Sequence, residues 1–460
     1  MRILSSSNRQ VVDRLIARDE ARNPAVERQA ARIVQDVRRR GDAAVLQWTR
    51  RLDARKGAPA MTKLAPLSKA ELRRGWTATP ADVRKAIKLA ARNLERVASK
   101  QVPRPFAIDV APGHRIEQRV QPLARVGCYV PGGRYPLPST LLMTVVPACV
   151  AGVPEVVVVC PRPAPVVLAA ALEAGATDVY AIGGAQAIGA LAYGTQTIAR
   201  VDKIVGPGNA WVAAAKALVS RDCAIDLHAG PSEIVVCSDR GRADWIAADL
   251  IAQAEHDPAA RAILVTTKRK LADEVARIVD ATLPADGPAR ASIAANGAVI
   301  VAHGKKDAIA LVNRLAPEHL VIDADDDPDA YRAAGTIFVG AWSVQAAGDY
   351  CTGSNHVLPT GGAARFRGGL SAADFVRVFS VQTLSERALR GIGPSVIALA
   401  EAEGLSAHAA SVQARVGAAT HRSGRGAGIS SSSTFDGLTS PRAGRGAKFE
   451  VRSSKFRAAR

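Results

Sequence analysis

The feature that most limits the fold of this chain is a long alternation of short apolar runs and helical segments, which begins at Arg125. The apolar runs of a first series are RVGCYVP, EVVVVCP, DVYAIGG, DKIVGPG and CAIDLHAG. A second series follows Gly230, with EIVVCS, AILVTT, GAVIVAH, LVIDA and TIFVGAW as its strands. Continuous apolar strands that alternate with helices are typical of parallel sheets covered on both faces. The sequence therefore predicts an α/β fold with two doubly wound domains.

The domain boundaries follow from length and from changes of pattern. A chain of 460 residues exceeds what one hydrophobic core usually serves. The segments at both ends of the alternation are helical in pattern, and Ser, Gly and Arg dominate beyond Gly417, which predicts a disordered basic tail. The expected parts are an N-terminal helical segment (1–25), one α/β domain (26–125 together with 231–375), a second α/β domain (126–230), a C-terminal helical lobe (376–416) and the tail (417–460).

The net charge of +19 raises the question of nucleic-acid binding. Residues 416–460 carry nine Lys or Arg against two Asp or Glu, so most of the excess is scattered along the rest of the chain. No basic run is interleaved with aromatic residues, as a base-stacking surface requires. An anionic cofactor suits this charge as well, and we expect no required nucleic-acid partner.

Cysteine usage and hydropathy indicate the compartment. The six Cys form neither a CxxC pair nor a regular disulfide spacing, which predicts reduced core residues of a cytoplasmic protein. The N-terminus lacks the apolar core of a signal peptide. Residues 141–160 are strongly apolar but are interrupted by Pro147, Pro154 and Glu155. We therefore expect a buried helix and a buried strand there, and no membrane span.

Three Gly-rich segments follow strands of the first series: YVPGGRYPLPST, IGGAQAIG and VGPGNAW. In open doubly wound sheets, such turns bring backbone N–H groups to phosphates at the carboxyl ends of the strands. The GxGxxG fingerprint of dinucleotide sites is missing, and each turn alone is equally explained as a tight connection. Three of them in one domain point to a phosphate or nucleotide site.

Potential metal ligands occur in three segments of the C-terminal half. They are Gln253 and His256 in DLIAQAEHDP, Asp349 and His356 in AGDYCTGSNHVLPT, and Glu403 and His408 in AEAEGLSAHAAS. Residues three apart on a helix share a face, and nitrogen and oxygen ligands suit Zn²⁺, or more weakly Mn²⁺ or Co²⁺. Helix ends, turn caps and solvent-facing positions explain the same residues, so spacing alone leaves the metal open.

The segment APEHLVID places Glu318 next to His319, just before an apolar strand. The simplest explanation is a helix that ends near Pro317, with both residues in an ordinary loop. A carboxylate beside an imidazole of near-neutral pKa is also a pair that proton-transfer chemistry uses. These eight residues alone do not decide between the two explanations.

Eight motifs, in this order, resemble those of the histidinol dehydrogenase family: VGCYVPGG, GGAQAIGALAYGT, KIVGPGNAWV, AGPSE, QAEHDP, PEHL, AGDYCTGSNHVLPT and EGLSAH. The resemblance covers about residues 21–415. It implies the final enzyme of histidine biosynthesis, which oxidises L-histidinol through L-histidinaldehyde to L-histidine and reduces two NAD⁺ in sequence. It also implies one Zn²⁺ per subunit, NAD bound by residues 126–230, and a homodimer in which the C-terminal lobe reaches the partner's active site.

The resemblance implies roles residue by residue. It implies Glu318 and His319 as catalytic residues, Tyr129, Gln186 and Asn209 as NAD contacts, Gln253, His256, Asp349 and His408 as zinc ligands, and Ser232, His319, His356 and Glu403, together with those ligands, as substrate contacts. His319 would take the alcohol proton while hydride leaves carbon, and Glu318 would activate the water that hydrates the aldehyde. Zinc would bind the imidazole and amino nitrogens of histidinol and so act as a template.

Some features depart from the family pattern, and two rivals remain open. The tail extends past the family's usual end, and the missing GxGxxG implies loosely held NAD in an incomplete Rossmann-like fold. His228 stands where many relatives have Pro, and we expect a tolerated loop change there. One rival is a relative that oxidises another polar alcohol, such as a sulfonated diol, although Glu403 and His408 favour histidinol. The other is a basic protein that binds nucleic acid through its tail.

Overall fold

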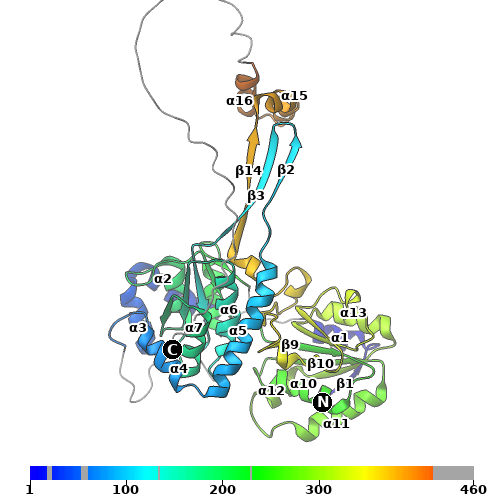
Figure 1. Cartoon of the computed structure of the whole chain (residues 1–460). Helices are drawn as coiled ribbons and strands as arrows, with labels where there is room; N and C mark the ends of the chain where they lie inside the picture. Colours follow the sequence, from blue (N-terminus) through cyan, green and yellow to red (C-terminus); the bar gives the residue numbers. More distant parts are fainter. Residues whose placement is uncertain (18–22, 53–60, 133–134, 228–229, 418–460) are drawn as a thin grey trace, which may run out of the picture. The chain divides into compact units, whose positions relative to one another are not determined.

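The computed structural model describes residues 1–17, 23–52, 61–132, 135–227 and 230–417 (Figure 1). The expectations for His228 and for the tail beyond Gly417 lie outside these residues. The described residues form two compact units. The larger contains residues 1–108 and 116–382, and the smaller contains residues 109–115 and those from 383 onward.

A five-stranded parallel sheet forms one part of the larger unit. Its order β6–β5–β4–β7–β8 shows that the chain winds outward from β4 in both directions, as in a doubly wound sheet. In β5, Val156 and Val158 face one core while Val157 and Val159 face the other. The strands are β4 (Arg125–Tyr129), β5 (Glu155–Val159), β6 (Asp178–Tyr180), β7 (Lys203–Val205) and β8 (Ala224–Ile225).

Eight helices cover the two faces of this sheet in the described residues. One face carries α4 (Lys69–Ala78), α5 (Ala81–Gln101), α6 (Pro138–Val150) and α7 (Pro165–Ala174), and the other carries α2 (Pro24–Arg40), α3 (Asp42–Leu52), α8 (Gly184–Tyr193) and α9 (Ala210–Val219). The expected buried helix and strand of residues 141–160 are α6 and β5. We expected residues 26–125 to join residues 231–375. Instead, α2 to α5 pack here, because their apolar stripes complete the two cores of this sheet.

A six-stranded parallel sheet, in the order β1–β11–β10–β9–β12–β13, forms the other part of the larger unit. Ile234 and Val236 of β9 face one core, and Val235 and Cys237 face the other. The strands are β1 (Ile3–Ser5), β9 (Glu233–Cys237), β10 (Arg261–Thr266), β11 (Ala298–Val301), β12 (His319–Ile322) and β13 (Thr336–Val339).

Helices again cover both faces of the six-stranded sheet (Figure 1). One face carries α10 (Ala243–Ala254), α11 (Arg269–Thr282) and α12 (Pro288–Asn296), and the other carries α1 (Arg9–Ile16) and α13 (Lys305–Leu315). Four short helical segments follow β12: η1 (Pro328–Ala330), α14 (Gln345–Gly348), η2 (Ala363–Arg365) and η3 (Ala372–Phe375). The predicted α/β class with parallel, doubly wound sheets is confirmed.

Both ends of the chain contain strands where we expected only helices. Residues 1–25 include β1, which pairs with β11 and was too short for its period to be recognised. Residues 376–416 begin with β14 (Val376–Leu384), which joins β3 (His114–Pro122) and β2 (Phe106–Ala111) in a three-stranded sheet of order β14–β3–β2.

The helices of the smaller unit are α15 (Glu386–Ala402) and α16 (Ser406–Val416). Their contact uses small residues, since Ala388, Ala400 and Ala409 are buried. Gly393 of α15 lies so close to α16 that an added Cβ would touch Val416 at 3.0 Å. The pair therefore has a thin core and leaves many of its side chains exposed.

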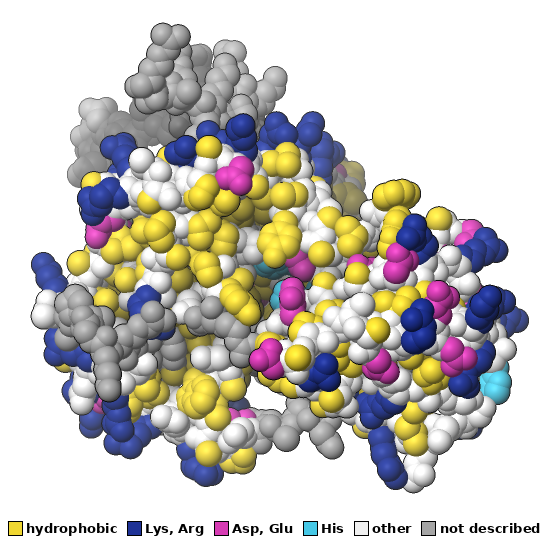
Figure 2. Space-filling model, turned by 90° about the horizontal axis from the view of Figure 1, so that it is seen from below, with side chains coloured by type: hydrophobic (Ala, Val, Ile, Leu, Met, Phe, Trp, Pro, Cys, Tyr) yellow, Lys and Arg dark blue, Asp and Glu magenta, His cyan; other side chains and the backbone are white. Residues whose placement is uncertain are grey.

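Two expectations from the sequence concern scattered positive charge and the lack of a membrane span, and the structure bears on both. On the face shown in Figure 2, Lys and Arg side chains are spread around the edges and interleaved with apolar and acidic ones. Among the described residues, no helix has the length and apolar content needed to cross a membrane.

Candidate active site

The segment that contains Glu318 and His319 forms the start of an inner strand of the six-stranded sheet. Helix α13 ends at Leu315, and Ala316 adopts a left-handed conformation with φ of 45° that redirects the chain. His319 is the first residue of β12 and lies opposite Ile234 of β9. The residues Glu318 and His319 are only 5% and 4% exposed. The two residues are therefore fixed in the interior at the amino edge of the sheet.

The main chain of one residue, Glu233, orients both side chains. Its N–H donates a hydrogen bond of 2.9 Å to Oε2 of Glu318. Its carbonyl oxygen lies 3.2 Å from Nδ1 of His319, which donates to it when that nitrogen carries the proton. In this tautomer, Nε2 of His319 keeps a free lone pair and can accept a proton.

Burial shifts the proton affinities of this pair in opposite directions. It raises the pKa of Glu318 well above its usual range, and the nearby charges of Glu233 and Asp349 add to the rise. Hydrogen bonds from Glu233 N–H and Ser232 oppose it. Burial lowers the pKa of His319 to about 4, although Asp349 favours the charged form. The imidazole is therefore neutral near pH 7, which is the form that a general base requires.

Asp349 lies between two imidazoles at the end of α14. Its Oδ1 is 3.7 Å from Nε2 of His319, and its Oδ2 is 3.9 Å from Nε2 of His256. Gln345 Nε2 donates to the same Oδ2 at 2.7 Å. His356 closes the group, because its Nδ1 lies 2.9 Å from the carbonyl oxygen of Asp349. The structure thus brings the predicted His319, His256, Asp349 and His356 to one place.

Gln253 lies in the last turn of α10 and is 1% exposed. Neither its amide oxygen nor its amide nitrogen has a hydrogen-bond partner among the described residues. An unpaired buried polar group costs roughly 1–3 kcal/mol, so such a side chain is suited to contact a bound group. His256 follows three residues later, at the same helix end.

The geometry does not by itself define a complete metal centre. Within the described residues, no group of three or more His, Cys, Asp or Glu side chains is arranged to hold a metal ion. The amide oxygen of Gln253 is an additional possible donor. Glu403 follows α15 and His408 lies on α16, so both belong to the smaller unit, where both are exposed.

The residues predicted to contact NAD share a cavity at the carboxyl edge of the five-stranded sheet. Tyr129, Gln186 and Asn209, which follow or end β4, β6 and β7, line this space of about 360 Å³, the cofactor cavity. Tyr129 Oη accepts a 3.1 Å hydrogen bond from Gly184 N–H, and Asn209 caps α9 through Val212 N–H. Gln186 is buried, and its amide oxygen has no partner among the described residues.

Two glycines allow the turns around the cofactor cavity to approach each other. An added Cβ on Gly132 would collide with the carbonyl of Pro161, and one on Gly206 would collide with the carbonyl of Tyr129. Gly206 also has φ of 107°, which side chains rarely adopt. The Gly-rich strand ends therefore expose main chain at the edge where a dinucleotide binds in such sheets.

Sequence reasoning missed a buried ion pair beneath these turns. Lys216 of α9 pairs with Asp226, and both side chains are almost fully buried. Lys216 Nζ donates to the carbonyl of Gly206 at 2.9 Å, while Asp226 accepts the N–H of Gly206 at 2.6 Å. A lysine in the otherwise apolar helix AWVAAAKALV was the available signal. The role of Glu233 had no such signal in the sequence, because its main chain, and not its side chain, holds Glu318 and His319.

Comparisons with known proteins agree on one family. The histidinol dehydrogenase family model matches residues 16–416. A histidinol dehydrogenase of Aromatoleum aromaticum is 45% identical over 417 residues, which are 88% of this chain and 94% of that protein. One of Acinetobacter baylyi is 42% identical over 90% of this chain and 99% of that protein. The crystal structure of histidinol dehydrogenase from Elizabethkingia anophelis matches with a TM-score of 0.83 and 32% identity, covering 88% of this chain and 96% of that one.

Proposed function

The chain belongs to the histidinol dehydrogenase family, and from this premise we propose that it oxidises L-histidinol through L-histidinaldehyde to L-histidine, the final step of histidine biosynthesis. The observation that carries the proposal is the buried pair of Glu318 and His319, held by the main chain of Glu233 beside Asp349. An acid–base pair of this kind is what oxidation of an alcohol to an acid needs at two separate steps.

His319 and Glu318 divide the proton transfers between them. NAD⁺ supplies the hydride acceptor in both oxidations, and Tyr129, Gln186 and Asn209 would hold it. His319 takes the hydroxyl proton of histidinol at Nε2, and the Glu233 carbonyl at Nδ1 stabilises the imidazolium that forms. Glu318 takes a proton from the water that adds to the aldehyde. His319, after releasing its first proton to solvent, then takes the proton of the hydrate as the second hydride leaves.

We further propose that Gln253, His256, Asp349 and His408 hold one Zn²⁺ per subunit. The proposal is supported by the unpaired, buried amide of Gln253 and by a nitrogen and oxygen donor set of the kind that zinc accepts. The ion would supply a template for the imidazole and amino nitrogens of histidinol. Ser232, His356 and Glu403 would contact the substrate around it.

A homodimer in which the smaller unit completes the partner's site is also proposed. Leu399 and Leu405 flank Glu403 on the smaller unit and are 65% and 43% exposed. Phe106, Ile108 and Val110 of β2 are likewise exposed and alternate along one face of that strand. Apolar side chains grouped in this way support burial against a second copy. A cytoplasmic location is supported by six free thiols, because such cysteines are typical of reducing compartments.

The deciding experiment supplies L-histidinol, NAD⁺ and Zn²⁺ and counts NADH per histidinol consumed. We expect two NADH, histidine as the product, and loss of activity with a chelator. In the Glu318→Gln variant, the amide keeps an acceptor for Glu233 N–H but cannot take a proton from water, so NADH per histidinol should fall toward one while aldehyde accumulates. No NADH from histidinol, with turnover of another polar alcohol, would contradict the proposal.

A further inference from the structure

The cofactor cavity contains one charged side chain among the described residues that line it, Arg162. Arg162 lies three residues after the end of β5 and is exposed. It forms no hydrogen bond or ion pair with any residue that the structure describes. No Asp or Glu is among the described lining residues. Among the described residues, the cavity therefore presents one guanidinium that no carboxylate compensates.

The backbone of Arg162 is also unusual. Its φ of 52° lies in the left-handed region, which in the described chain only Ala316 shares among non-glycine residues. Such a conformation costs roughly 1–2 kcal/mol for a residue with a Cβ. Pro161 and Pro163 flank the residue and stiffen the turn. Residues whose backbone is held in such a sparsely populated conformation occur often at ligand sites.

The position of Arg162 in the topology has a defined meaning in dinucleotide sites. Starting from β4, β5 is the second strand of its series and lies next to it in the sheet. In doubly wound dinucleotide domains, an acidic residue in this region binds the 2′-hydroxyl of the adenosine ribose in NAD, whereas an arginine accommodates the 2′-phosphate of NADP. The described part of this cavity has the arginine and lacks the acid.

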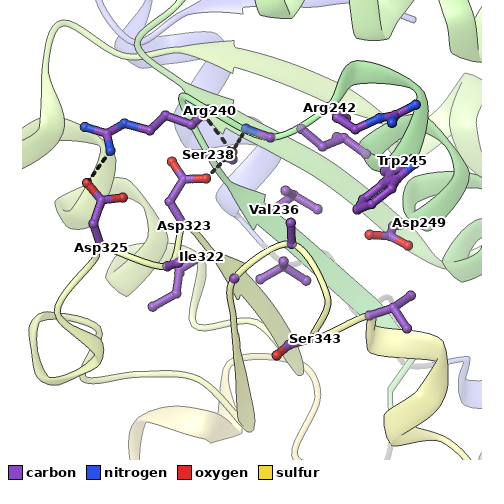
Figure 3. Close-up of a pocket in the computed structure, with 17 residues that line it drawn as sticks. Val236, Ser238, Arg240, Arg242, Trp245, Asp249, Ile322, Asp323, Asp325 and Ser343 are labelled. Atoms are coloured by element: carbon purple, nitrogen blue, oxygen red, sulfur yellow. Dashed lines mark hydrogen bonds and ion pairs between the residues drawn. The ribbon is translucent and has the colours of Figure 1, made fainter.

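The other parallel sheet provides an internal comparison. A cavity of about 390 Å³ lies at the carboxyl edge of the six-stranded sheet, lined by Arg240 and Arg242 among others (Figure 3). Arg240 is paired with Asp325 at 2.8 Å, and Arg242 is paired with Asp244 at 2.7 Å. In that cavity the chain neutralises its arginines with its own carboxylates. In the cofactor cavity, Arg162 has no such partner among the described residues.

We propose that Arg162 binds the 2′-phosphate of NADP⁺, so that the enzyme accepts NADP⁺ as well as NAD⁺. The inference rests on the proposed function, because it assigns a specificity residue to the same cofactor cavity. A guanidinium can bind a phosphate through two parallel hydrogen bonds, and the exposed side chain leaves room for the group. The reaction is unchanged: one hydride leaves the substrate carbon for each NADP⁺ reduced to NADPH, and the proton goes to His319.

Binding of two adenosine fragments to the full chain tests this assignment without turnover. Isothermal titration with adenosine 2′,5′-bisphosphate and with 5′-AMP should show tighter binding of the bisphosphate. Arg162→Ala should weaken the bisphosphate roughly 10- to 100-fold and change 5′-AMP less than twofold. Alanine is used rather than glycine because it keeps a Cβ, so the energetic cost of the left-handed backbone conformation at position 162 does not change. Arg162→Lys should retain part of the preference, and Arg240→Ala is the matched control that should change neither fragment.

Steady-state kinetics give a second readout. With histidinol as substrate, Arg162→Ala should lower kcat/KM for NADP⁺ by the same factor as the bisphosphate affinity and leave kcat/KM for NAD⁺ within twofold. Equal binding of the two fragments by the natural chain would overturn the proposal. So would an Arg162→Ala variant that weakens both fragments alike. If histidinol is not oxidised with either cofactor, the proposed function fails, and the fragment titration still decides the role of Arg162.

Discussion

The two parallel sheets of the larger unit place their candidate sites at opposite edges. In the five-stranded sheet, the cofactor cavity lies at the carboxyl edge, where α8 and α9 begin. In the six-stranded sheet, Glu318 and His319 lie at the amino edge, where α10 and α13 end. The general rule for open α/β sheets, that ligands bind at the carboxyl ends of the strands, describes the first site and not the second.

The difference has an electrostatic explanation. Helix N-termini carry partial positive charge and favour anions, whereas helix C-termini carry partial negative charge and favour cations. A dinucleotide brings phosphates, so the carboxyl edge suits it. Histidinol is an amine, and the proposed zinc is a cation, so the amino edge suits both. Each edge thus matches the sign of the charge that it is proposed to receive.

The carboxyl edge of the six-stranded sheet shows that topology alone does not make a site. There Asp323 accepts hydrogen bonds from the Ser238 hydroxyl (Figure 3) and from Asp239 N–H, the latter at 2.8 Å. Nearby, Arg240 and Asp325 form an ion pair with a separation of 2.8 Å. The polar groups of this edge are largely satisfied by one another, whereas the amide oxygen of Gln186 and the guanidinium of Arg162 have no partner among the described residues.

The largest expected effect tests the amino edge. His319→Ala removes the proposed base and should lower kcat about 10²- to 10⁴-fold. Its zinc content, measured by mass spectrometry of the purified protein, should stay at one per subunit, since His319 is not a proposed ligand. His303→Ala, an exposed histidine on the same sheet's surface, is the control and should keep full activity. Loss of zinc together with activity would show that His319 has another role.

The next largest effect concerns the buried ion pair at the carboxyl edge of the five-stranded sheet, which we expect to contribute strongly to the stability of the protein. Lys216→Met leaves the charge of Asp226 buried without its partner, and about 3–5 kcal/mol of unfolding free energy should be lost. Urea unfolding followed by circular dichroism measures this loss. Adding Asp226→Asn should recover part of it, because the unpaired charge is removed. A loss below about 1 kcal/mol would show that the pair is not needed to hold the Gly206 turn.

A smaller effect separates cofactor binding from catalysis. Tyr129→Phe removes the acceptor of Gly184 N–H at the cofactor cavity, and KM for NAD⁺ should rise roughly 5- to 10-fold with little change in kcat. Tyr193→Phe is the matched control, since its hydroxyl bonds Asp222 outside the cavity at 2.9 Å. Equal effects of the two substitutions on KM would remove Tyr129 from the proposed contacts.

The smallest effect concerns α2, which covers the five-stranded sheet. Hydrogen bonds from Arg40 hold the pKa of Asp36 below its usual range, with Trp48 and Arg39 contributing. Asp36→Asn should therefore cost about 1 kcal/mol at pH 7. A depressed folded-state pKa contributes stability above the unfolded pKa, near 4, so the difference should shrink as pH falls below about 4. Thermal unfolding measured from pH 7 to pH 3 checks this. The control is Asp273→Asn, which breaks an exposed ion pair with Arg269 and should lower the unfolding free energy by less than about 0.5 kcal/mol.

The sequence was sufficient to predict both parallel sheets, because buried strands are continuously apolar and stand out between helices. It was not sufficient to assign α2 to α5 to a sheet, since an amphipathic helix reveals an apolar face but not the surface that covers it. The strand β14 was missed because VRVFSVQTL mixes apolar and polar residues within a segment expected to be helical. The Gly-rich turns, in contrast, marked the strand ends that surround the cofactor cavity.

For the candidate site, motifs indicated which residues matter but not how they are held. Nothing in PEHL indicates that Glu318 and His319 lie at the amino edge, because that depends on the neighbour of β12 in the sheet. The closeness of Asp349 to both His319 and His256 depends on the loop that follows β13. The pairing of Lys216 with Asp226 joins a helix to a segment after β8, and a charged residue in an apolar helix does not name its partner.

The anchoring of two side chains by the main chain of Glu233 has a consequence for mutational tolerance. An alanine scan would report position 233 through its carboxylate, which raises the pKa of Glu318. The scan would not detect the anchoring of Glu318 and His319 by the main chain, because almost every amino acid supplies the same N–H and carbonyl. Only proline, which lacks the N–H, would release Glu318. The hydrogen bonds that anchor Glu318 and His319 are therefore independent of the side chain at position 233.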